Sequence, residues 1–275
     1  MLDLFKKNLS KAIKERIKAL IFLIQSLGAK YHCPVCNNRI RYFQPLSDFY
    51  FIKTKQYGYP YTFKQSETLN YHDYSCPICW ASDRERLYAL YIQSYFESDK
   101  ADRALKIIDF APSAPLSCFI RNYISLSQHK ISYRTADMNL DGVDDIVDIV
   151  DMKLYNDNQF DFFICSHVLE HVSDDRKALC ELYRILKPQG LGILMVPIIL
   201  GLAEIDEDPS IKDESERWRR FGQHDHVRLY SKNGFIRRVR ETGFFIHQYG
   251  KEYFGEMLFA QSGITNQSIL YVVEK

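Results

Sequence analysis

The chain has 275 residues, of which 46% are hydrophobic and 26% charged, and its formal net charge is +1. This length suits one α/β domain with a small additional module. With a near-neutral net charge, the chain has no strong positive potential of the kind that proteins use to wrap nucleic acid. We therefore expect no DNA partner and consider an RNA partner disfavoured. The chain begins without the features of a secretory signal, and its best apolar run, residues 19–24, is too short to span a membrane. We therefore expect a location in the cytoplasm or at the inner membrane surface.

Apolar residues recur at helical spacing between residues 3 and 28, opposite a row of lysines and one arginine. The pattern predicts a basic amphipathic helix that occupies residues 1–30. Two interpretations stay open for it. The helix contacts an anionic membrane surface, or it packs on its own protein or on a second copy of the chain.

Residues 31–102 are rich in cysteine, proline and tyrosine. Two matching Cys-Pro-x-Cys motifs supply four thiolates, namely Cys33, Cys36, Cys76 and Cys79. In a reducing cytosol such pairs are typical of metal ligation, and together they predict one tetrahedral Zn²⁺ in a zinc-ribbon-like module. Because a closed site of four cysteines has no open position for a substrate, this zinc is expected to be structural. Residues 83–96 regain helical spacing and connect the module to a second domain, residues 103–275.

Strand-like and helix-like segments alternate after residue 103. Short runs rich in Ile, Val and Phe predict strands at residues 104–109, 132–137, 146–150, 160–166, 191–197, 244–249 and 269–273. Helical patterns lie between several of these runs, and residues 232–242 form another. The alternation indicates an α/β fold with a mostly parallel sheet covered by helices on both faces.

Asp109 and Asp137 end the first two predicted strands, and the third brings Asp148 and Asp151. In doubly wound sheets, ligands bind where the carboxyl ends of strands meet the amino ends of helices. The turn after the first strand, residues 110–115, is the usual cofactor cradle of such sheets. The carboxylate after the second strand suits the hydroxyls of a ribose.

Two segments carry a family resemblance: Phe160-Asp-Phe-Phe-Ile-Cys-Ser-His-Val-Leu-Glu-His171 and Leu186-Lys-Pro-Gln-Gly190. With them, residues 104–275 resemble the class I S-adenosylmethionine-dependent methyltransferases, in particular the type 11 group. The Cys-Pro-x-Cys motifs and Phe221-Gly-Gln-His-Asp-His-Val-Arg228 resemble bacterial members that often accompany surface-glycan assembly genes. The resemblance implies a Rossmann-like sheet of seven strands and S-adenosyl-L-methionine as cofactor.

The resemblance also implies cofactor-binding residues at the ends of the first four strands. They are Asp109, Phe110, Ala111, Ser113, Asp137, Met138, Asp148, Ile149, Asp151, Ser166 and His167. Asp109 would orient the methionine end, and Asp137 would take the ribose hydroxyls. Asp148 would receive the adenine amino group, with Asp151 as the alternative. Ser166 and His167 would lie beneath the sulfonium.

The turn after the first strand departs from the family's pattern. Most members have a glycine-rich turn here, because glycine lets the backbone pass close to the cofactor and accepts left-handed dihedral angles. This chain has Ala111-Pro-Ser-Ala-Pro115 instead. We interpret the turn as a variant cradle. The alternative is a descendant that has lost catalysis.

Methyl transfer is an in-line displacement that needs alignment, exclusion of water and, for a hydroxyl acceptor, a base. Histidine titrates near neutral pH, so His226 and His224 are the first candidates for this base, followed by His171. An equally open interpretation of His171 is a residue that packs on the sheet. The arginines at positions 217, 219, 220 and 228 either hold an anionic group of the acceptor or pair with the acidic residues between 206 and 216.

The leading hypothesis is thus an enzyme that methylates a small-molecule or glycan acceptor at oxygen, using S-adenosyl-L-methionine. Methylation of RNA is a second hypothesis, which the near-neutral charge disfavours. A third is a binding protein that keeps the methyltransferase fold without turnover.

Overall fold

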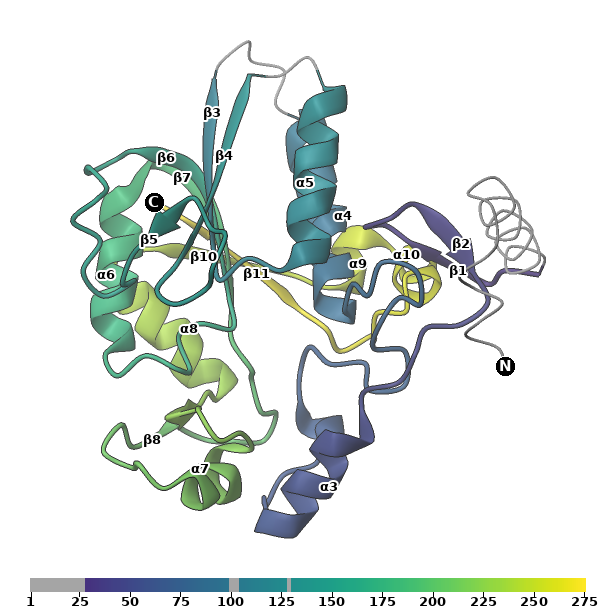
Figure 1. Ribbon diagram of the computed structural model, residues 1–275, viewed down its shortest axis with the longest axis vertical. Coiled ribbons are helices and arrows are strands. Elements are labelled where there is room, and N and C mark those ends of the chain that lie inside the picture. The colour runs from purple at the N-terminus through teal and green to yellow at the C-terminus, as the bar shows by residue number, and fades with distance from the viewer. Residues whose placement is uncertain (1–27, 99–103, 128–129) are drawn as a thin grey trace, which may run out of the picture.

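The computed structural model describes residues 28–98, 104–127 and 130–275 (Figure 1). The amphipathic helix predicted for residues 1–30 lies outside the described residues up to residue 27, and residues 28–30 are not helical. Neither of the two interpretations of that helix is therefore tested. Over the described ranges, no helix combines the length and the apolar character that crossing a bilayer requires.

A sheet of seven strands forms the centre of the fold, in the order β10-β11-β7-β6-β3-β4-β5. Its strands are β3 (Leu105–Phe110), β4 (Ile131–Asp137), β5 (Asp145–Ile146), β6 (Phe160–Ser166), β7 (Leu186–Met195), β10 (Phe245–Tyr249) and β11 (Leu270–Glu274). Neighbours from β7 to β5 pair in parallel, whereas β11 pairs antiparallel with both β7 and β10. The predicted α/β sheet, mostly parallel and seven-stranded, is confirmed.

Helices cover both faces of the sheet (Figure 1). Helices α4 (Asp83–Ser98) and α5 (Ala114–Leu126) lie on one face, and α6 (Asp175–Ile185) and α8 (Lys232–Glu241) lie on the other. Neighbouring side chains of β6 point to opposite faces. The ring of Phe162 lies 4.9 Å from that of Tyr95 in α4, and the ring of Phe163 lies 6.2 Å from that of Phe244 beside β10.

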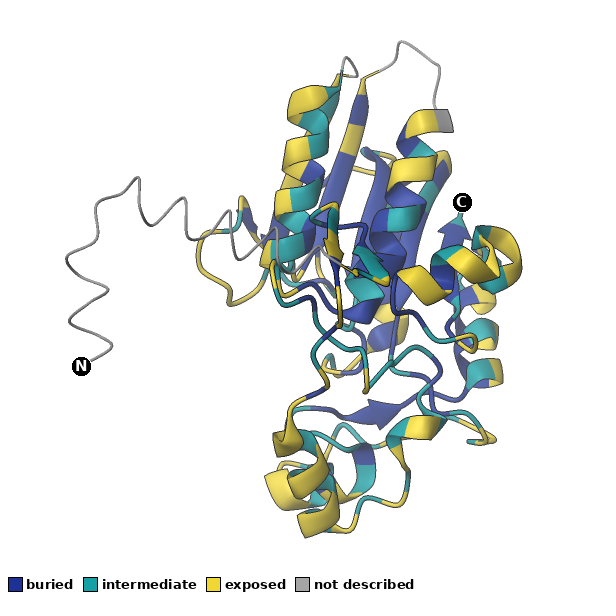
Figure 2. Ribbon diagram, turned by 90° about the vertical axis from the view of Figure 1, so that its right-hand side faces the viewer, coloured by how far each residue is buried: buried dark blue, intermediate teal, exposed yellow. Residues whose placement is uncertain are grey.

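Strand β6 is buried on both faces, which explains its continuous apolar sequence. Figure 2 shows the buried strands between helices whose outer surfaces are exposed. Two of the predicted strands differ from the observed ones. The run at residues 146–150 forms only the short β5. The strand predicted at 191–197 begins earlier, at Leu186, and the register of β7 against β6 shifts between Phe160 and Phe162.

The segment before the sheet begins with a hairpin of β1 (Tyr31–Cys33) and β2 (Asn38–Ile40), followed by α3 (Asp48–Tyr57) and the 3-10 helix η1 (Phe63–Gln65). Helix α3 packs on α7 (Glu214–Phe221) in the lower lobe of Figure 1, where Tyr57 stacks on Trp218 at 5.9 Å. Beside α7, β8 (Asp206–Glu207) pairs with β9 (Arg228–Leu229). The short helices α9 (Lys251–Phe254) and α10 (Glu256–Gln261) precede β11.

Arg86, in the first turn of α4, joins three segments of the chain. Its fully buried guanidinium donates hydrogen bonds to five backbone carbonyls, those of Asp73, Tyr74, Ala81, Ser262 and Gly263. The same group lies 3.7 Å from the centre of the Phe43 ring. Because buried carbonyls need donors, this one side chain holds the loop before α4 against the residues that follow α10.

We expect Arg86→Met to lower the free energy of unfolding by about 3 kcal/mol or more, because buried carbonyls would lose their donor. Chemical denaturation measures this loss. Arg176→Met is the matched control: its side chain is 57% exposed and pairs across the surface with Glu241, so its replacement should cost less than about 1 kcal/mol. Equal losses in the two variants would contradict the assigned role of Arg86.

Candidate functional site

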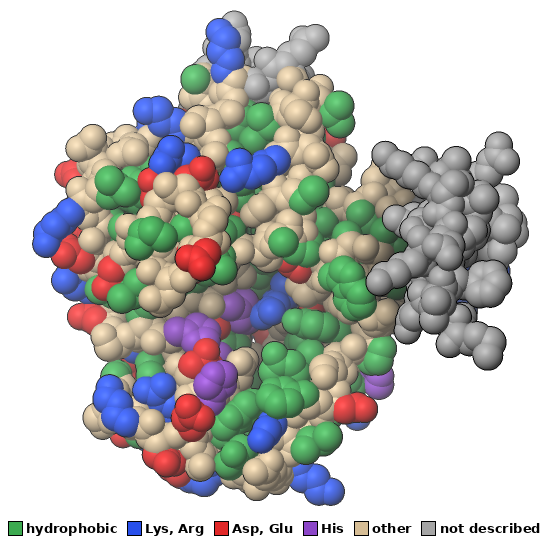
Figure 3. Space-filling view, in the orientation of Figure 1, with side chains coloured by type: hydrophobic (Ala, Val, Ile, Leu, Met, Phe, Trp, Pro, Cys, Tyr) green, Lys and Arg blue, Asp and Glu red, His purple; other side chains and the backbone are tan. Residues whose placement is uncertain are grey.

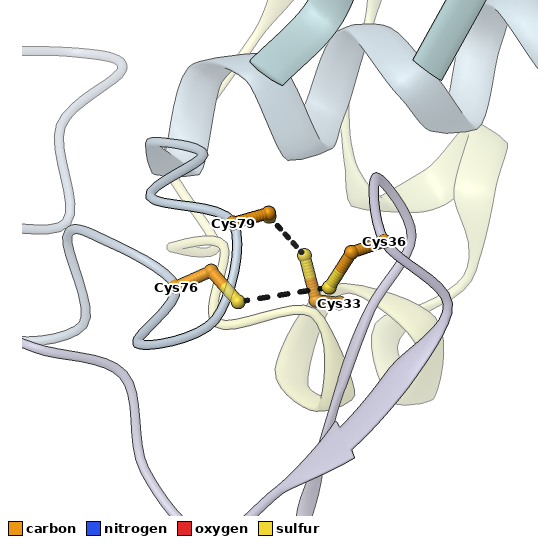
Figure 4. A group of neighbouring side chains, drawn as sticks. All are labelled: Cys33, Cys36, Cys76 and Cys79. Atoms are coloured by element: carbon orange, nitrogen blue, oxygen red, sulfur yellow. Dashed lines mark hydrogen bonds between the residues drawn. The ribbon is translucent and has the colours of Figure 1, made fainter. Parts of the chain in front are cut away.

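The four cysteines of the two Cys-Pro-x-Cys motifs come together. Cys33 and Cys36 lie on the β1–β2 hairpin, and Cys76 and Cys79 lie on the turn before α4 (Figure 4). The Sγ atoms of Cys33 and Cys79 are 3.7 Å apart, those of Cys36 and Cys76 are 3.8 Å apart, and all four lie within 4.8 Å of one another. Four sulfurs at the Zn–S bond length would be roughly 3.8 Å apart, so this cluster could hold a tetrahedral zinc ion.

The carboxyl ends of β3, β4, β5 and β6 surround a cavity of about 510 Å³, which we call the strand-end cavity. Most of the predicted cofactor residues line it: Phe110, Ala111, Asp137, Met138, Asp148, Ile149 and His167. Parallel strands end at a common edge, which is why residues from four separate strands of the sequence meet here.

The Ala-Pro turn leaves the strand-end cavity open. Ala111 has a φ of 51°, the left-handed backbone conformation that favours glycine, and its N–H donates to the carbonyl of Ala136 at 2.9 Å. Pro112 lies outside the lining of the cavity. Alanine thus adopts a left-handed backbone conformation in the turn where the family's pattern has glycine.

A second cavity, of about 280 Å³, lies between α4 and the ends of β3 and β6; we call it the α4 cavity. It shares Phe110, Ala111 and His167 with the strand-end cavity and is also lined by the predicted Asp109, Ser113 and Ser166. Helix α4 contributes Arg84, Glu85 and Tyr88 to its wall. All the predicted cofactor residues except Asp151 therefore line one or both of two adjoining cavities.

Hydrogen bonds fix the polar groups of the α4 cavity. Tyr133 donates to Asp109 Oδ2 at 2.6 Å, and Tyr88 and Ser166 bond through their hydroxyls at 2.8 Å. Ser113 caps α5 and donates to Glu85 of α4. Burial raises the pKa of Asp109 to about 7, although the bond from Tyr133 opposes this rise.

The two predicted alternatives for adenine differ in position. Asp148 lines the strand-end cavity, where its Oδ1 accepts from the N–H of Val150 at 3.0 Å. Asp151 lies outside that lining and pairs with Lys153 at 2.7 Å. The geometry therefore favours Asp148 for any contact with a ligand in this cavity.

His167 lies where three cavities meet. Besides the two cavities above, it lines a third of about 140 Å³, the module cavity, whose walls come from residues 46–84, from residues 196–199 after β7 and from the 221–229 segment. Arg84 donates to His167 Nε2 at 2.6 Å, which leaves the ring proton on Nδ1, 3.0 Å from Glu170 Oε1. Burial and the neighbouring guanidinium lower the pKa of His167 to about 4, so the ring is neutral.

The three predicted catalytic histidines occupy different environments. His226 is buried and lines the module cavity, and burial lowers its pKa to about 4. His171 lines the strand-end cavity, with Nδ1 3.2 Å from Asp225 Oδ2. His224 is 54% exposed and lines none of the three cavities. Figure 3 shows histidine side chains gathered around a hollow in the middle of this face.

The arginines near α7 bond within the protein. Arg219 pairs with Glu216, and Arg220 with Asp206. The buried Arg228 donates to the carbonyls of the 169–173 turn, and Arg217 donates to the carbonyl of Ile211. These contacts agree with the alternative in which the arginines pair locally.

Arg84, Glu85 and Glu170 were not predicted as site residues. The sequence does contain a signal for Arg84 and Glu85, namely a capping box that marks the start of a helix. In it, Glu85 accepts from the N–H of Ser82 at 2.5 Å. The start of α4 could therefore have been predicted from the sequence, but the contact of its first turn with β6 could not. Glu170 lies in the quoted family motif, but its proximity to His226 depends on the tertiary fold.

Part of this chain matches a known protein family. Residues 116–194, from α5 to β7, match the family described as a methyltransferase domain. The chain thus contains an S-adenosylmethionine-dependent methyltransferase domain, as the resemblance implied. None of the curated proteins matches the chain significantly.

Among solved structures, a methyltransferase from Archaeoglobus fulgidus aligns at 12% identity and a TM-score of 0.43, covering 70% of this chain and 94% of that one. A putative methyltransferase from Bacillus halodurans aligns at 14% identity and a TM-score of 0.40, covering 68% and 98%. The CurJ carbon methyltransferase aligns at 14% and 0.44, and the match spans 70% of this chain and 57% of that one. These similarities are too distant to bear on the acceptor.

The raised pKa of Asp109 predicts a pH-dependent stability. The folded protein binds this proton more tightly than the unfolded chain does, so the free energy of unfolding should fall as the pH rises from about 4 to 7. Asp109→Asn should flatten this part of the profile, measured by denaturation over that range. Asp151→Asn, at an exposed position, should leave it nearly unchanged. Parallel profiles for wild type and Asp109→Asn would contradict the prediction.

Proposed function

We propose that this methyltransferase domain transfers a methyl group from S-adenosyl-L-methionine to an oxygen atom of a small-molecule or glycan acceptor. The observation that carries the proposal is the meeting of three cavities at His167. Two of them are lined by the predicted cofactor residues, and the third opens beside them. A donor and an acceptor in adjoining cavities would be held for in-line displacement.

The residues of the strand-end cavity fit the adenosine part of the cofactor. Asp137 Oδ1 accepts from the N–H groups of Asn139 and Leu140 at 2.7 and 2.8 Å, which holds the carboxylate at the end of β4. A fixed carboxylate suits the two hydroxyls of a ribose, and Asp148 with the backbone of Ile149 suits the adenine edge. When bound, the cofactor supplies an electrophilic methyl group.

The α4 cavity fits the amino-acid end of the cofactor, because it combines charges of both signs. Asp109 and Glu85 offer carboxyl groups, and Arg84 offers a guanidinium. An ammonium and a carboxylate would find opposite charges on these side chains. Since Arg84 and Glu85 belong to the segment that follows the four cysteines, the N-terminal module would complete the cofactor site.

The acceptor assignment rests on the module cavity and the groove beside it. An aromatic groove of about 480 Å³ shares Thr54, Tyr59 and Phe63 with the module cavity. Its remaining walls include Phe51, Tyr61 and Tyr71. Aromatic faces of this kind suit the apolar faces of sugar rings. A small cavity next to an aromatic groove therefore favours an acceptor that places one sugar or one small ring beside the cofactor.

Of the three predicted histidines, His226 is best placed to act on the acceptor, because it lines the module cavity. His224 lines none of the three cavities, and His171 faces the strand-end cavity. The chain's own contribution to catalysis would be alignment, exclusion of water and removal of the hydroxyl proton. Arg84 would position His167 between the donor and the acceptor.

The function is tested by cofactor binding and methyl transfer together. Asp137→Ala should weaken binding of S-adenosylhomocysteine by about tenfold or more, measured by calorimetry, because charge-assisted hydrogen bonds to the ribose would be lost. Asp151→Ala, which lies outside the cavity lining, should bind as wild type does. The absence of binding by the wild-type chain would overturn the proposal.

For the acceptor, the wild-type chain is incubated with tritium-labelled S-adenosyl-L-methionine and separate bacterial pools of sugar nucleotides, oligosaccharides and RNA. We expect label in a carbohydrate pool, with Asp137→Ala as the inactive control. Label in the RNA pool would instead favour the RNA hypothesis. Binding without label in any pool would favour a protein that keeps the fold without turnover.

We further propose that the four cysteines bind one structural Zn²⁺. Their mutual distances and the pairing of two tight turns support this assignment. Cys36→Ser should lose the metal and lower the melting temperature, whereas Cys118→Ser, at an exposed cysteine outside the cluster, should do neither. Because Arg84 and Glu85 follow the cluster, we also expect weaker S-adenosylhomocysteine binding after zinc removal. Full metal content in Cys36→Ser would refute the assignment.

A further inference from the structure

Glu170 is a carboxylate in an unusual environment. It lies in the turn after β6, its side chain is fully buried, and neither carboxylate oxygen accepts a well-directed hydrogen bond from the described residues. The polar atoms around it belong to imidazoles: His167 Nδ1 lies 3.0 Å from Oε1 and His171 Nε2 lies 4.0 Å from the same oxygen. A buried carboxylate without a compensating charge costs several kcal/mol, so this site calls for a cation.

His226 adds a second group without a partner. Its ring is 3% exposed, and Nδ1 has no hydrogen-bond partner among the described residues. The ring centres of His226 and His171 are 4.7 Å apart. One ligand atom each from Glu170, His171 and His226 lies within 4.8 Å of the others. Two imidazoles and a carboxylate form a donor set typical of divalent transition metals.

The surrounding residues hold these side chains in place. Asp225 Oδ2 lies 3.2 Å from His171 Nδ1, which turns Nε2 of that ring toward Glu170. A carboxylate behind a histidine is a common support of metal ligands. The N–H of Val227 donates to the carbonyl of Glu170 at 2.9 Å, and Arg228 donates to the carbonyls of Leu169, Val172 and Ser173. The turn is therefore fixed on both sides of Glu170.

We infer that Glu170, His171 and His226 bind one divalent transition-metal cation, separate from the four-cysteine cluster. At metal–ligand distances of about 2.1 Å, the three donor atoms would be roughly 3.4 Å apart in tetrahedral geometry. Small movements of the side chains suffice, since the atoms already lie within 4.8 Å of one another. Three protein ligands leave at least one position open for another molecule.

The position of this metal site between two cavities suits a role in the methyl-transfer reaction. His171 lines the strand-end cavity and His226 lines the module cavity, so the cation would lie in the wall between them. With the cation bound, His226 would act as a ligand and not as the base: a hydroxyl of the acceptor in the open position would ionise more readily and release its proton to solvent. Its oxygen would then form the new C–O bond as the C–S bond of the donor breaks. This role rests on the proposed function, whereas the metal site itself does not.

Metal binding is tested on the full chain with Co²⁺ as the probe, because its visible spectrum distinguishes sulfur from nitrogen and oxygen ligands. We expect the wild-type chain to bind a second equivalent beyond the one held by the cysteines, with a spectrum free of thiolate bands. Glu170→Gln and His171→Ala should weaken the second equivalent by about 100-fold while keeping the first. His224→Ala, an exposed histidine of the same segment, should retain both.

Crystals of the wild-type chain soaked in Co²⁺ give a readout that is independent of the folding of any variant. An anomalous peak among the three side chains supports the inference, and a peak at the cysteines alone overturns it. A second equivalent that persists in both Glu170→Gln and His171→Ala overturns it as well. Binding of S-adenosylhomocysteine is measured on the same samples. If the chain binds S-adenosylhomocysteine but no second Co²⁺, the metal site is refuted and the methyltransferase assignment is not; if it binds Co²⁺ but no S-adenosylhomocysteine, the reverse holds.

Discussion

The start of α4 is the constraint on which the rest of the structure depends. Each residue of Asp83-Arg-Glu-Arg86 contacts a different part of the chain: Asp83 accepts from the N–H of Asn70, Arg84 donates to His167, Glu85 accepts from Ser113, and Arg86 binds five carbonyls. The turn directly follows the second pair of cysteines. The cysteine cluster therefore sets the position of α4, and α4 sets the position of the side chains above the sheet.

The sequence alone predicted the parts of the fold that local patterns determine. The buried apolar run of β6 and the paired cysteines were recognisable because burial on both faces and metal ligation each impose a strict local pattern. The strand expected at residues 146–150 is shorter, because the chain turns into the loop that carries Asp148 along the cavity. Here the demands of the site outweigh the β propensity of Ile and Val.

The candidate site was only partly predictable for a similar reason. Asp137 could be found because it ends a predicted strand, and Asp148 because the family resemblance implied it. The cluster of Glu170 with His226 could not, since the two residues lie far apart in the sequence and meet only when the segment before β9 folds over the end of β6. Ala111 shows a third case: the sequence showed that glycine is replaced in this turn, but not that alanine adopts the left-handed conformation there.

The contact between Ser113 and Glu85 limits which substitutions this chain can tolerate. The turn after β3 holds its conformation without glycine, and it is tied by Ser113 to a side chain from the cysteine-bearing segment. A substitution in either partner alters the other's surroundings. We therefore expect the effects of substitutions at these two positions to be coupled. A chimera with a relative's amino-terminal segment would bring a foreign side chain to this turn, so the segment is an integral part of the fold and not an exchangeable accessory.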